Sequence, residues 1–397
     1  MRTTVVRSLG VAAVVGVAGA ATAAVRAASS KRRALDGIDA IEVQDEKPFS
    51  WAADRVETVR TSDGVELHVE IDEPEGHDSR PSVIFSHGYC LTAASWIHQR
   101  RALVAAGYRC VLWDQRGHGQ SGHGNPDNST VDQLGLDLAA VIERTCPTGP
   151  IALVGHSMGG MTIMALALER PELVAERVCA TALVATSAGG KGLVTTGFGA
   201  VLGGVLHRYG PRVLVGLSAQ RGLWQRARGM ARDVESLFVE RFSFSSPVSE
   251  ETVRFCADML MGTDLQVVGA FLGSLEKHDK TAALEAFAGM PVLVVNGEED
   301  VMTPPEDSAA IVAALPGAEH LLVTDAGHLV MLEHPSLVNL HLLSFLDRAG
   351  ESVRETVSTP RKRERVTDLR RRHVVAEIAG GRARRGARKS RAEESQP

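Results

Sequence analysis

The feature that most constrains this chain is a Gly-x-Ser-x-Gly pattern at Gly155, Ser157 and Gly159. The apolar residues just before it predict a strand, and the apolar run 161–168 just after it predicts a helix. A strand that turns sharply into a helix holds the serine in a strained backbone conformation and leaves its hydroxyl accessible. Gly155 and Gly159 are then required, because strand and helix approach closely. The alternative interpretation is a helix whose first turn is capped by Ser157.

A serine nucleophile needs a base, and the base needs a group that orients it. Two later apolar, strand-like runs end near residues that supply these groups, Asp300 and His328. A carboxylate at the carboxyl end of a strand, before a helix that starts with proline, is well placed to hold an imidazole. We therefore predict Ser157 as the nucleophile, His328 as the base and Asp300 as the acid.

Other residues compete for these roles. Glu298 and Glu299 precede Asp300 directly, and either is an alternative acid. Asp325 precedes the histidine and is interpreted as a turn former. Further histidines are interpreted as loop or packing residues, since none forms a metal-ligand cluster with Cys or Asp: His118, His123, His156 and His334.

Several motifs between residues 54 and 348 resemble those of the α/β-hydrolase superfamily. They are Ser86-His87-Gly88-Tyr89, the D-x-R-G-x-G-x-S loop Asp114–Gly122, the elbow Gly155–Gly160, the acid turn Gly297–Pro304, and Ala326-Gly327-His328 followed by Glu333-His334-Pro335. The order serine, acid, histidine is also that of the superfamily. The resemblance implies that His87 and Gly88 have a structural role in an oxyanion turn.

The chemistry assigns one role to each group. Ser157 Oγ would attack an acyl carbonyl, His328 would take its proton and return it to the leaving group, and Asp300 would fix the tautomer of the histidine. Two donors must face the developing negative charge. We expect one to be the backbone N–H of Met158 at a helix start, and the resemblance implies that the other is the backbone N–H of Tyr89.

The identity of the nucleophile excludes some activities. Dehalogenases and epoxide hydrolases of the superfamily use aspartate at the elbow, whereas this chain has Ser157. We therefore predict a serine hydrolase that cleaves a carboxylic ester with a lipid-like or medium-sized acyl group and needs neither cofactor nor metal. A cofactor-free haloperoxidase or perhydrolase-like activity, or acyl transfer to another acceptor, would use the same triad. A non-catalytic binding protein is a further alternative.

Strand-like and helix-like runs alternate along the middle of the chain, which predicts an α/β fold with a mostly parallel, eight-stranded sheet flanked by helices. We expect strands near 54–60, 64–71, 82–86, 109–113, 151–155, 178–185, 292–296 and 320–324. We expect helices near 92–106, 130–145, 158–169, 305–315 and 335–348. The hydrolase core would comprise residues 48–187 and 291–348.

The interval 188–290 is too long for a simple crossover between two strands. The resemblance implies that it is a mainly helical cap, or lid, inserted over the elbow. Its first part, 188–232, carries seven Lys and Arg residues and no Asp or Glu. Two interpretations stay open: a mobile, solvated surface, or a cationic and apolar surface that meets anionic lipid or an acidic acylated substrate.

Both ends of the chain differ from the core. In the N-terminal segment 1–47, residues 8–25 are uncharged and about as long as a membrane span, and basic residues lie on both sides. This predicts membrane association through an anchor, with export after cleavage of a signal peptide as the alternative, and leaves the side of the catalytic domain open.

The C-terminal region 349–397 has 14 Lys and Arg against 7 Asp and Glu, although the whole chain has a net charge of −5. Such a basic region of low hydrophobicity is expected to be disordered. Together with the N-terminal segment it could contact an anionic membrane surface. No nucleic-acid fold signature accompanies it, so we do not expect nucleic acid as a partner; the expected partner is a small acyl ester substrate.

Overall fold

The centre of the molecule is a sheet of nine strands, counted over the residues that the computed structural model describes, which are 49–75, 80–189, 239–352 and 364–366. The strand order is β1-β2-β4-β3-β5-β6-β7-β8-β9. The bounds are β1 Arg55–Arg60, β2 Glu66–Asp72, β3 Ser82–Ser86, β4 Cys110–Trp113, β5 Ile151–His156, β6 Val178–Val184, β7 Val292–Gly297, β8 Glu319–Val323 and β9 Glu364–Val366. Strands β1, β2 and β4 pair antiparallel, and every other pair is parallel.

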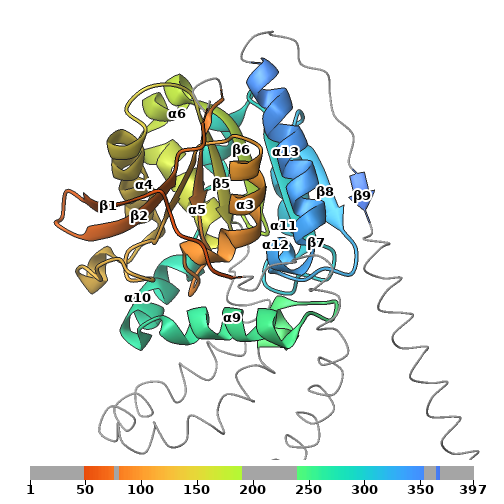
Figure 1. The fold of residues 1–397 in the computed structure, drawn as a ribbon, viewed down its shortest axis with the longest axis horizontal. Coiled ribbons are helices and arrows are strands. Elements are labelled where there is room, and N and C mark those ends of the chain that lie inside the picture. The colour runs from red at the N-terminus through yellow and green to blue at the C-terminus, as the bar shows by residue number, and fades with distance from the viewer. Residues whose placement is uncertain (1–48, 76–79, 190–238, 353–363, 367–397) are drawn as a thin grey trace, which may run out of the picture.

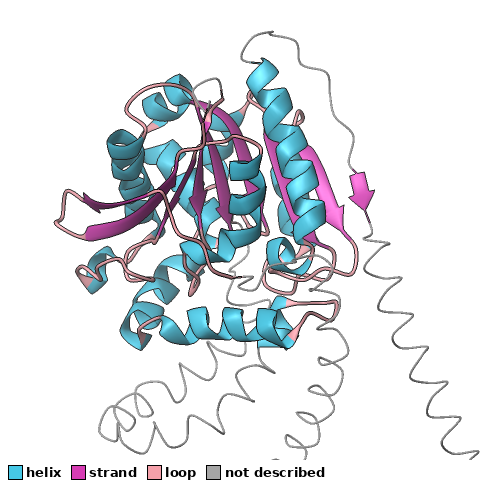
Figure 2. Cartoon of the chain, in the orientation of Figure 1, coloured by secondary structure: helices cyan, strands magenta, loops and turns pink. Residues whose placement is uncertain are grey.

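Helices cover both faces of this sheet (Figure 2). Their bounds are α3 Ile97–Ala105, α4 Val131–Thr145, α5 Met158–Glu169, α6 Pro171–Arg177, α11 Pro305–Ala314, α12 Val330–Glu333 and α13 Pro335–Ser352, with short 3₁₀ helices η2 Ala93–Trp96, η3 Pro126–Asn128 and η4 Thr281–Phe287. The central strands are buried on both faces, as a parallel sheet requires. On one face α3 and α13 pack into a core cluster with Trp96 and Phe345; on the other, α4, α5 and α11 pack with Ile142, Ile163 and Ile311.

The predicted fold class is confirmed, since all eight expected strands are present and helices flank the sheet. Two short helices, α6 and α12, were not predicted, and α13 continues four residues beyond 348. The ninth strand, β9, lies within the region that the sequence predicts to be a disordered basic tail. It pairs with β8 at the edge of the sheet, where backbone groups of β8 would otherwise lack partners.

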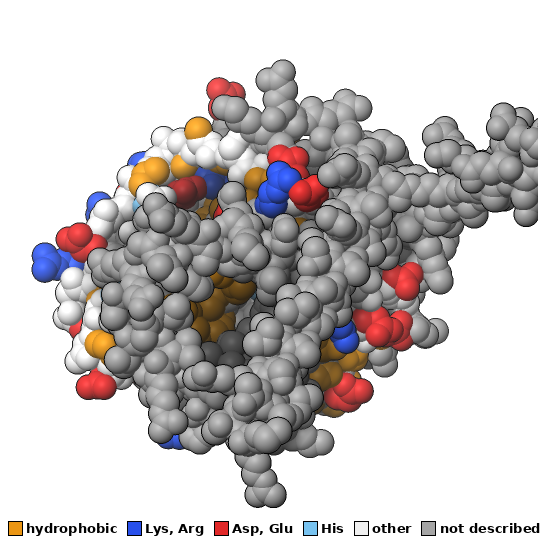
Figure 3. Space-filling model, turned by 90° about the horizontal axis from the view of Figure 1, so that it is seen from below, with side chains coloured by type: hydrophobic (Ala, Val, Ile, Leu, Met, Phe, Trp, Pro, Cys, Tyr) orange, Lys and Arg blue, Asp and Glu red, His pale blue; other side chains and the backbone are white. Residues whose placement is uncertain are grey.

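The described part of the predicted cap, residues 239–290, is called the cap segment below. It contains α9 Glu250–Gly262 and α10 Leu265–Glu276, and each begins at a capping side chain, Ser249 or Asp264. Figure 1 shows both helices at the end of the molecule where the parallel strands have their carboxyl ends. Viewed from that side, hydrophobic side chains are visible near the centre of the face (Figure 3). The basic part of the predicted cap, 190–232, lies outside the described residues.

No single helix among the described residues is long and apolar enough to cross a membrane; α9 and α10 meet that test only together, and they meet at 89°. The predicted anchor at residues 8–25 lies outside the described residues. So does the predicted tail, apart from the end of α13 and β9.

Candidate active site

The predicted site residues all follow strands of the parallel part of the sheet. Ser157 follows β5, Asp300 follows β7, His328 follows β8, and the turn with His87 to Tyr89 follows β3. Since parallel strands have their carboxyl ends at the same edge of a sheet, these four loops converge at one edge. The strand order β3-β5-β6-β7-β8 places Ser157 between the oxyanion turn and the two loops with Asp300 and His328.

Ser157 has the strained backbone that the sequence predicts, with φ of 51° and ψ of −116°. Two hydrogen bonds hold this backbone: the Ser157 N–H donates to Val184 O at 2.9 Å, and Thr186 Oγ1 donates to Ser157 O at 2.7 Å. The serine side chain forms no capping hydrogen bond with α5, so the capping interpretation does not hold. The hydroxyl is therefore not engaged by the helix that it precedes.

The two glycines of the elbow are required by close backbone contacts. A methyl group at position 155 would lie 2.5 Å from Gly159 O, and one at position 159 would lie 2.1 Å from Ser86 O. Both neighbours are backbone atoms, which cannot move aside as a flexible side chain can. The glycines therefore allow β5, α5 and the turn after β3 to meet at Ser157.

His328 and Asp300 form a buried pair, with His328 Nδ1 2.9 Å from Asp300 Oδ2. A carboxylate only accepts, so Nδ1 carries the proton and Nε2 has its lone pair free to accept one. Met302 N and Thr303 N donate to the other oxygen of Asp300, and Thr303 Oγ1 donates to Oδ2 at 2.8 Å. These donors compensate for the water that the buried carboxylate has lost.

The alternative acids are not joined to the histidine by any hydrogen bond recorded for the described residues. The Glu298 N–H donates to Val323 O and the Glu299 N–H to Ala326 O, so both backbones tie the loop after β7 to the loop after β8. Asp325 has a φ of 56°, which fits the turn role that the sequence predicts. The contact of Asp300 with His328 makes it the best supported acid.

His156 contributes more than packing. Its Nε2–H donates to His328 O at 3.0 Å, and the two imidazole rings lie 4.8 Å apart between centroids. Burial lowers the pKa of His156 well below its ordinary value, so the ring is neutral. The residue before Ser157 thus fixes the backbone of His328, a contact that the sequence does not reveal because the partner is a distant carbonyl.

The oxyanion turn is held by His87, which the sequence assigns a structural role. His87 Nδ1 donates to Gly88 O at 2.8 Å, and its Nε2 accepts from the Gln115 N–H at 2.9 Å. Burial lowers the pKa of His87 to about 4, so the ring stays neutral and keeps this acceptor. Within the described residues, the backbone N–H groups of Tyr89 and Met158 donate to no recorded acceptor, which leaves both available for an oxyanion.

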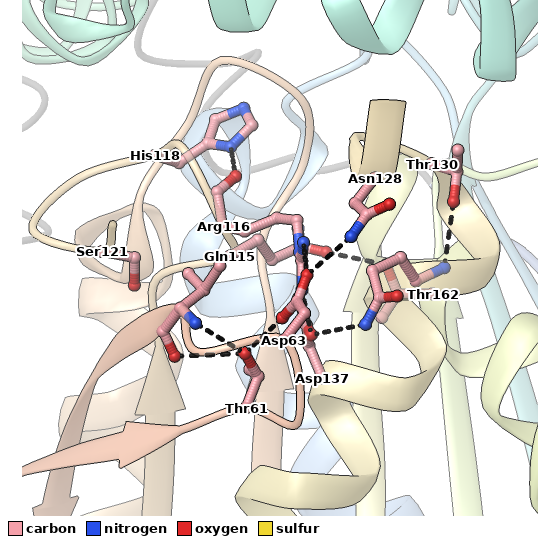
Figure 4. Close-up of polar contacts among 12 residues, drawn as sticks. Thr61, Asp63, Gln115, Arg116, His118, Ser121, Asn128, Thr130, Asp137 and Thr162 are labelled. Atoms are coloured by element: carbon pink, nitrogen blue, oxygen red, sulfur yellow. Dashed lines mark hydrogen bonds and ion pairs between the residues drawn. The ribbon is translucent and has the colours of Figure 1, made fainter. Parts of the chain in front are cut away.

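Gln115 and Thr162 are contributors that the sequence did not single out. Thr162 Oγ1, on α5, donates to Gln115 Oε1 at 2.7 Å, and Gln115 Nε2 donates to His87 O. The neighbouring Arg116 is buried and donates to Asp137 and Asp63, which anchors the loop that carries Gln115 (Figure 4). This network connects the predicted oxyanion turn with α5, the helix that begins directly after Ser157.

Comparison with known proteins identifies the family of this chain. Residues 77–335 match the family model described as serine aminopeptidase, S33. A relative from Mycobacterium tuberculosis, named "Putative non-heme bromoperoxidase BpoC", is 30% identical over 66% of this chain and 92% of its own length.

Solved structures with the same fold include an esterase from Thermogutta terrifontis, with a TM-score of 0.56 and 22% identity over 75% of this chain and 99% of that one. A hydrolase from Pseudomonas aeruginosa PA01 has a TM-score of 0.55 and 26% identity over 74% of this chain and 99% of that one. The chain therefore belongs to the α/β-hydrolase superfamily, within the family described as serine aminopeptidase S33, and it is an enzyme of that superfamily.

Proposed function

We propose that this enzyme hydrolyses carboxylic esters with a lipid-like or medium-sized acyl group, through an acyl-enzyme on Ser157. The observation that carries the proposal is the hydrogen bond from His328 Nδ1 to Asp300, because it leaves Nε2 able to accept a proton at the edge of the sheet where the strained Ser157 also lies. The esterase among the structural neighbours supports the same class of reaction.

The reaction follows from these positions in two halves. In the first, His328 Nε2 takes the proton of Ser157 Oγ as the oxygen attacks the ester carbonyl, and the resulting imidazolium gives that proton to the leaving alcohol. In the second half, His328 deprotonates water, which attacks the acyl-enzyme and releases the acid. Asp300 stabilises the imidazolium in both halves.

The tetrahedral intermediates carry negative charge on the former carbonyl oxygen. The N–H groups of Met158 and Tyr89 are the proposed donors, since neither has another acceptor among the described residues. Such a pair is effective only if both donors are fixed before the reaction. The bonds of His87 and Gln115 fix the turn that carries Tyr89.

Peracid formation is a second candidate, favoured by the relative named as a bromoperoxidase. Hydrogen peroxide would replace water in the second half, so that the acyl-enzyme yields a peracid and free Ser157. Adding peroxide and bromide to an ester reaction tests this, because a peracid oxidises bromide whereas a carboxylic acid does not.

The test of the main proposal is hydrolysis of p-nitrophenyl esters with short, medium and long acyl chains by the full chain, with Ser157→Ala as the control. We expect turnover with medium or long chains and none in the variant. An aminoacyl p-nitroanilide series, suggested by the family description, tests amide cleavage in parallel. Equal ester turnover by Ser157→Ala would refute the proposal.

We also propose, on sequence alone, that residues 8–25 attach the enzyme to a membrane. Fractionation of cells into membrane and soluble parts, with deletion of residues 1–28 as the control, tests this. An intact N-terminus in the membrane fraction supports an anchor. A mature enzyme that starts directly after Ala21-Thr22-Ala23, a small-residue motif that fits signal-peptidase cleavage, supports export.

A further inference from the structure

Glu333, at the end of α12, is fully buried between two loops that are far apart in the sequence. Its Oε2 accepts a hydrogen bond from the N–H of Gly327, the residue before His328, at 2.7 Å. Its Oε1 accepts from the N–H of Ser245 at 2.9 Å and from the N–H of Ser246. A single carboxylate thus joins the turn that carries the base to the cap segment.

A direct backbone contact reinforces this connection. The N–H of Leu329 donates to Ser243 O at 2.9 Å. There is no spare space between the two loops, because a methyl group at position 327 would lie 2.8 Å from Ser243 O and 3.0 Å from Phe244. The cap segment and the histidine turn therefore cannot move independently near His328.

We propose that Glu333 is a positioning residue through which the cap segment controls the placement of His328. This inference rests on the proposed function, in which His328 is the base for Ser157. Among the hydrogen bonds of the described residues, none joins Glu333 to Ser157 or Asp300. Glu333 instead holds the backbone of the turn that carries the imidazole of His328. A substrate that displaces residues 243–246 would thereby change the reactivity of the base.

Glu333→Gln tests this, because glutamine has nearly the same shape but replaces one acceptor with a donor. Its amide NH₂ would face the N–H of Gly327 or the N–H groups of Ser245 and Ser246, so one loop loses its bond. We measure the rate at which a fluorophosphonate labels Ser157, together with kcat and KM for an ester. We expect labelling and kcat to fall about 10- to 100-fold, with KM changed less than about two-fold.

The matched control is Asp72→Asn, which also replaces a buried carboxylate with an amide. Asp72 lies at the end of β2, away from the histidine turn, where it forms an ion pair with Arg100 and accepts a hydrogen bond from the indole Nε1–H of Trp51. We expect it to lower the thermal unfolding temperature at least as much as Glu333→Gln, while the labelling rate stays within about two-fold of wild type. If folded Glu333→Gln were labelled at the wild-type rate, the proposal that Glu333 controls the placement of His328 would be wrong.

A second measurement serves if Glu333→Gln does not fold. In the wild-type protein the amides of Ser245, Ser246 and Gly327 share one acceptor group, so we expect their hydrogen exchange to show similar protection. Protection that differs more than about ten-fold between Gly327 and the serines would overturn the proposal. If wild-type Ser157 is not labelled at all, the proposed function fails, and this inference fails with it.

Discussion

The proposed reactive groups are held in place by different means on the two sides of the candidate site. On the nucleophile side, formed by β3, β5 and the start of α5, Ser157 is held by its backbone. This backbone has a positive φ and makes two hydrogen bonds, one with the backbone of Val184 and one with the hydroxyl of Thr186, and two glycines lie in close contact around it. On the base side, formed by the loops after β7 and β8, the backbone is also held, but Asp300 and His328 depend in addition on hydrogen bonds between their own side chains and those of their neighbours. Substitutions of the residues that support these groups should therefore mainly lower the stability of the protein on the nucleophile side and mainly lower the reaction rate on the base side.

The largest expected effect is on the base side. Asp300→Asn removes the carboxylate that fixes the His328 tautomer, and we expect kcat for ester hydrolysis to fall about 10⁴-fold. The backbone N–H groups of Met302 and Thr303 can still donate to the amide oxygen, so the fold should persist. Ester kinetics and circular dichroism on the same sample test this. A fall of less than about ten-fold would mean that another group orients the histidine.

On the nucleophile side, Gly159→Ala should be the most damaging small change. The added methyl group would lie 2.1 Å from Ser86 O, and we expect it to destabilise the protein by about 3 kcal/mol or more. Gly269→Ala is the matched control, because an added methyl group on this exposed helical glycine meets nothing within 4 Å. It should stabilise by about 0.5–1 kcal/mol. Chemical denaturation gives the free energy of unfolding of both variants. Equal values would contradict the expectation that the close backbone contact requires glycine at position 159.

Acid should weaken the nucleophile side through His87. Burial lowers its pKa to about 4 in the folded state, whereas the unfolded chain has the ordinary value of 6.5. Between these values only the unfolded state binds the proton, so stability is complete above pH 6.5 and falls as pH decreases toward 4. The loss should reach about 3 kcal/mol.

Denaturation curves across this pH range, compared with those of His87→Gln, measure the contribution of this histidine. The variant should show a flatter dependence on pH, because it has no imidazole at this position to protonate. Parallel curves for the two proteins would mean that His87 does not titrate as described.

The smallest expected effect concerns Thr303, which donates Oγ1–H to Asp300 Oδ2. Thr303→Val keeps the shape but leaves one lone pair of the buried carboxylate without its donor. We expect a loss of about ten-fold in kcat, whereas Thr303→Ser should stay near wild type because it retains the hydroxyl. Steady-state kinetics of Thr303→Val and Thr303→Ser test this expectation. Equal kcat values in the two variants would show that the Thr303 hydroxyl is not needed.

Much of this molecule could be predicted because its signals are local. The strands from β3 to β8 are rich in apolar residues, β2 alternates polar and apolar residues, and the elbow is a pattern of small residues around Ser157. The strand β9 could not be predicted from Glu-Arg-Val in a basic region, because the free edge of β8 supplies its partners. α12 was missed because it is a single turn of four residues.

The support of the site was harder to predict, because it joins residues far apart in the chain. His156 belongs to the elbow motif, yet its role depends on the carbonyl of His328. Glu333 stands in a motif behind the histidine, but nothing in the sequence connects it with the backbone of Ser245. A side chain that bonds to a distant backbone group cannot be recognised from one sequence, because every residue has a backbone and the identity of the partner residue carries no signal.

The most direct test of the account is to treat the full chain with a fluorophosphonate and locate the adduct by mass spectrometry. The account predicts one adduct, on Ser157, absent in Ser157→Ala and formed much more slowly in Asp300→Asn. An adduct on another residue, or equal labelling of Ser157→Ala, would contradict the assignment of Ser157 as the nucleophile.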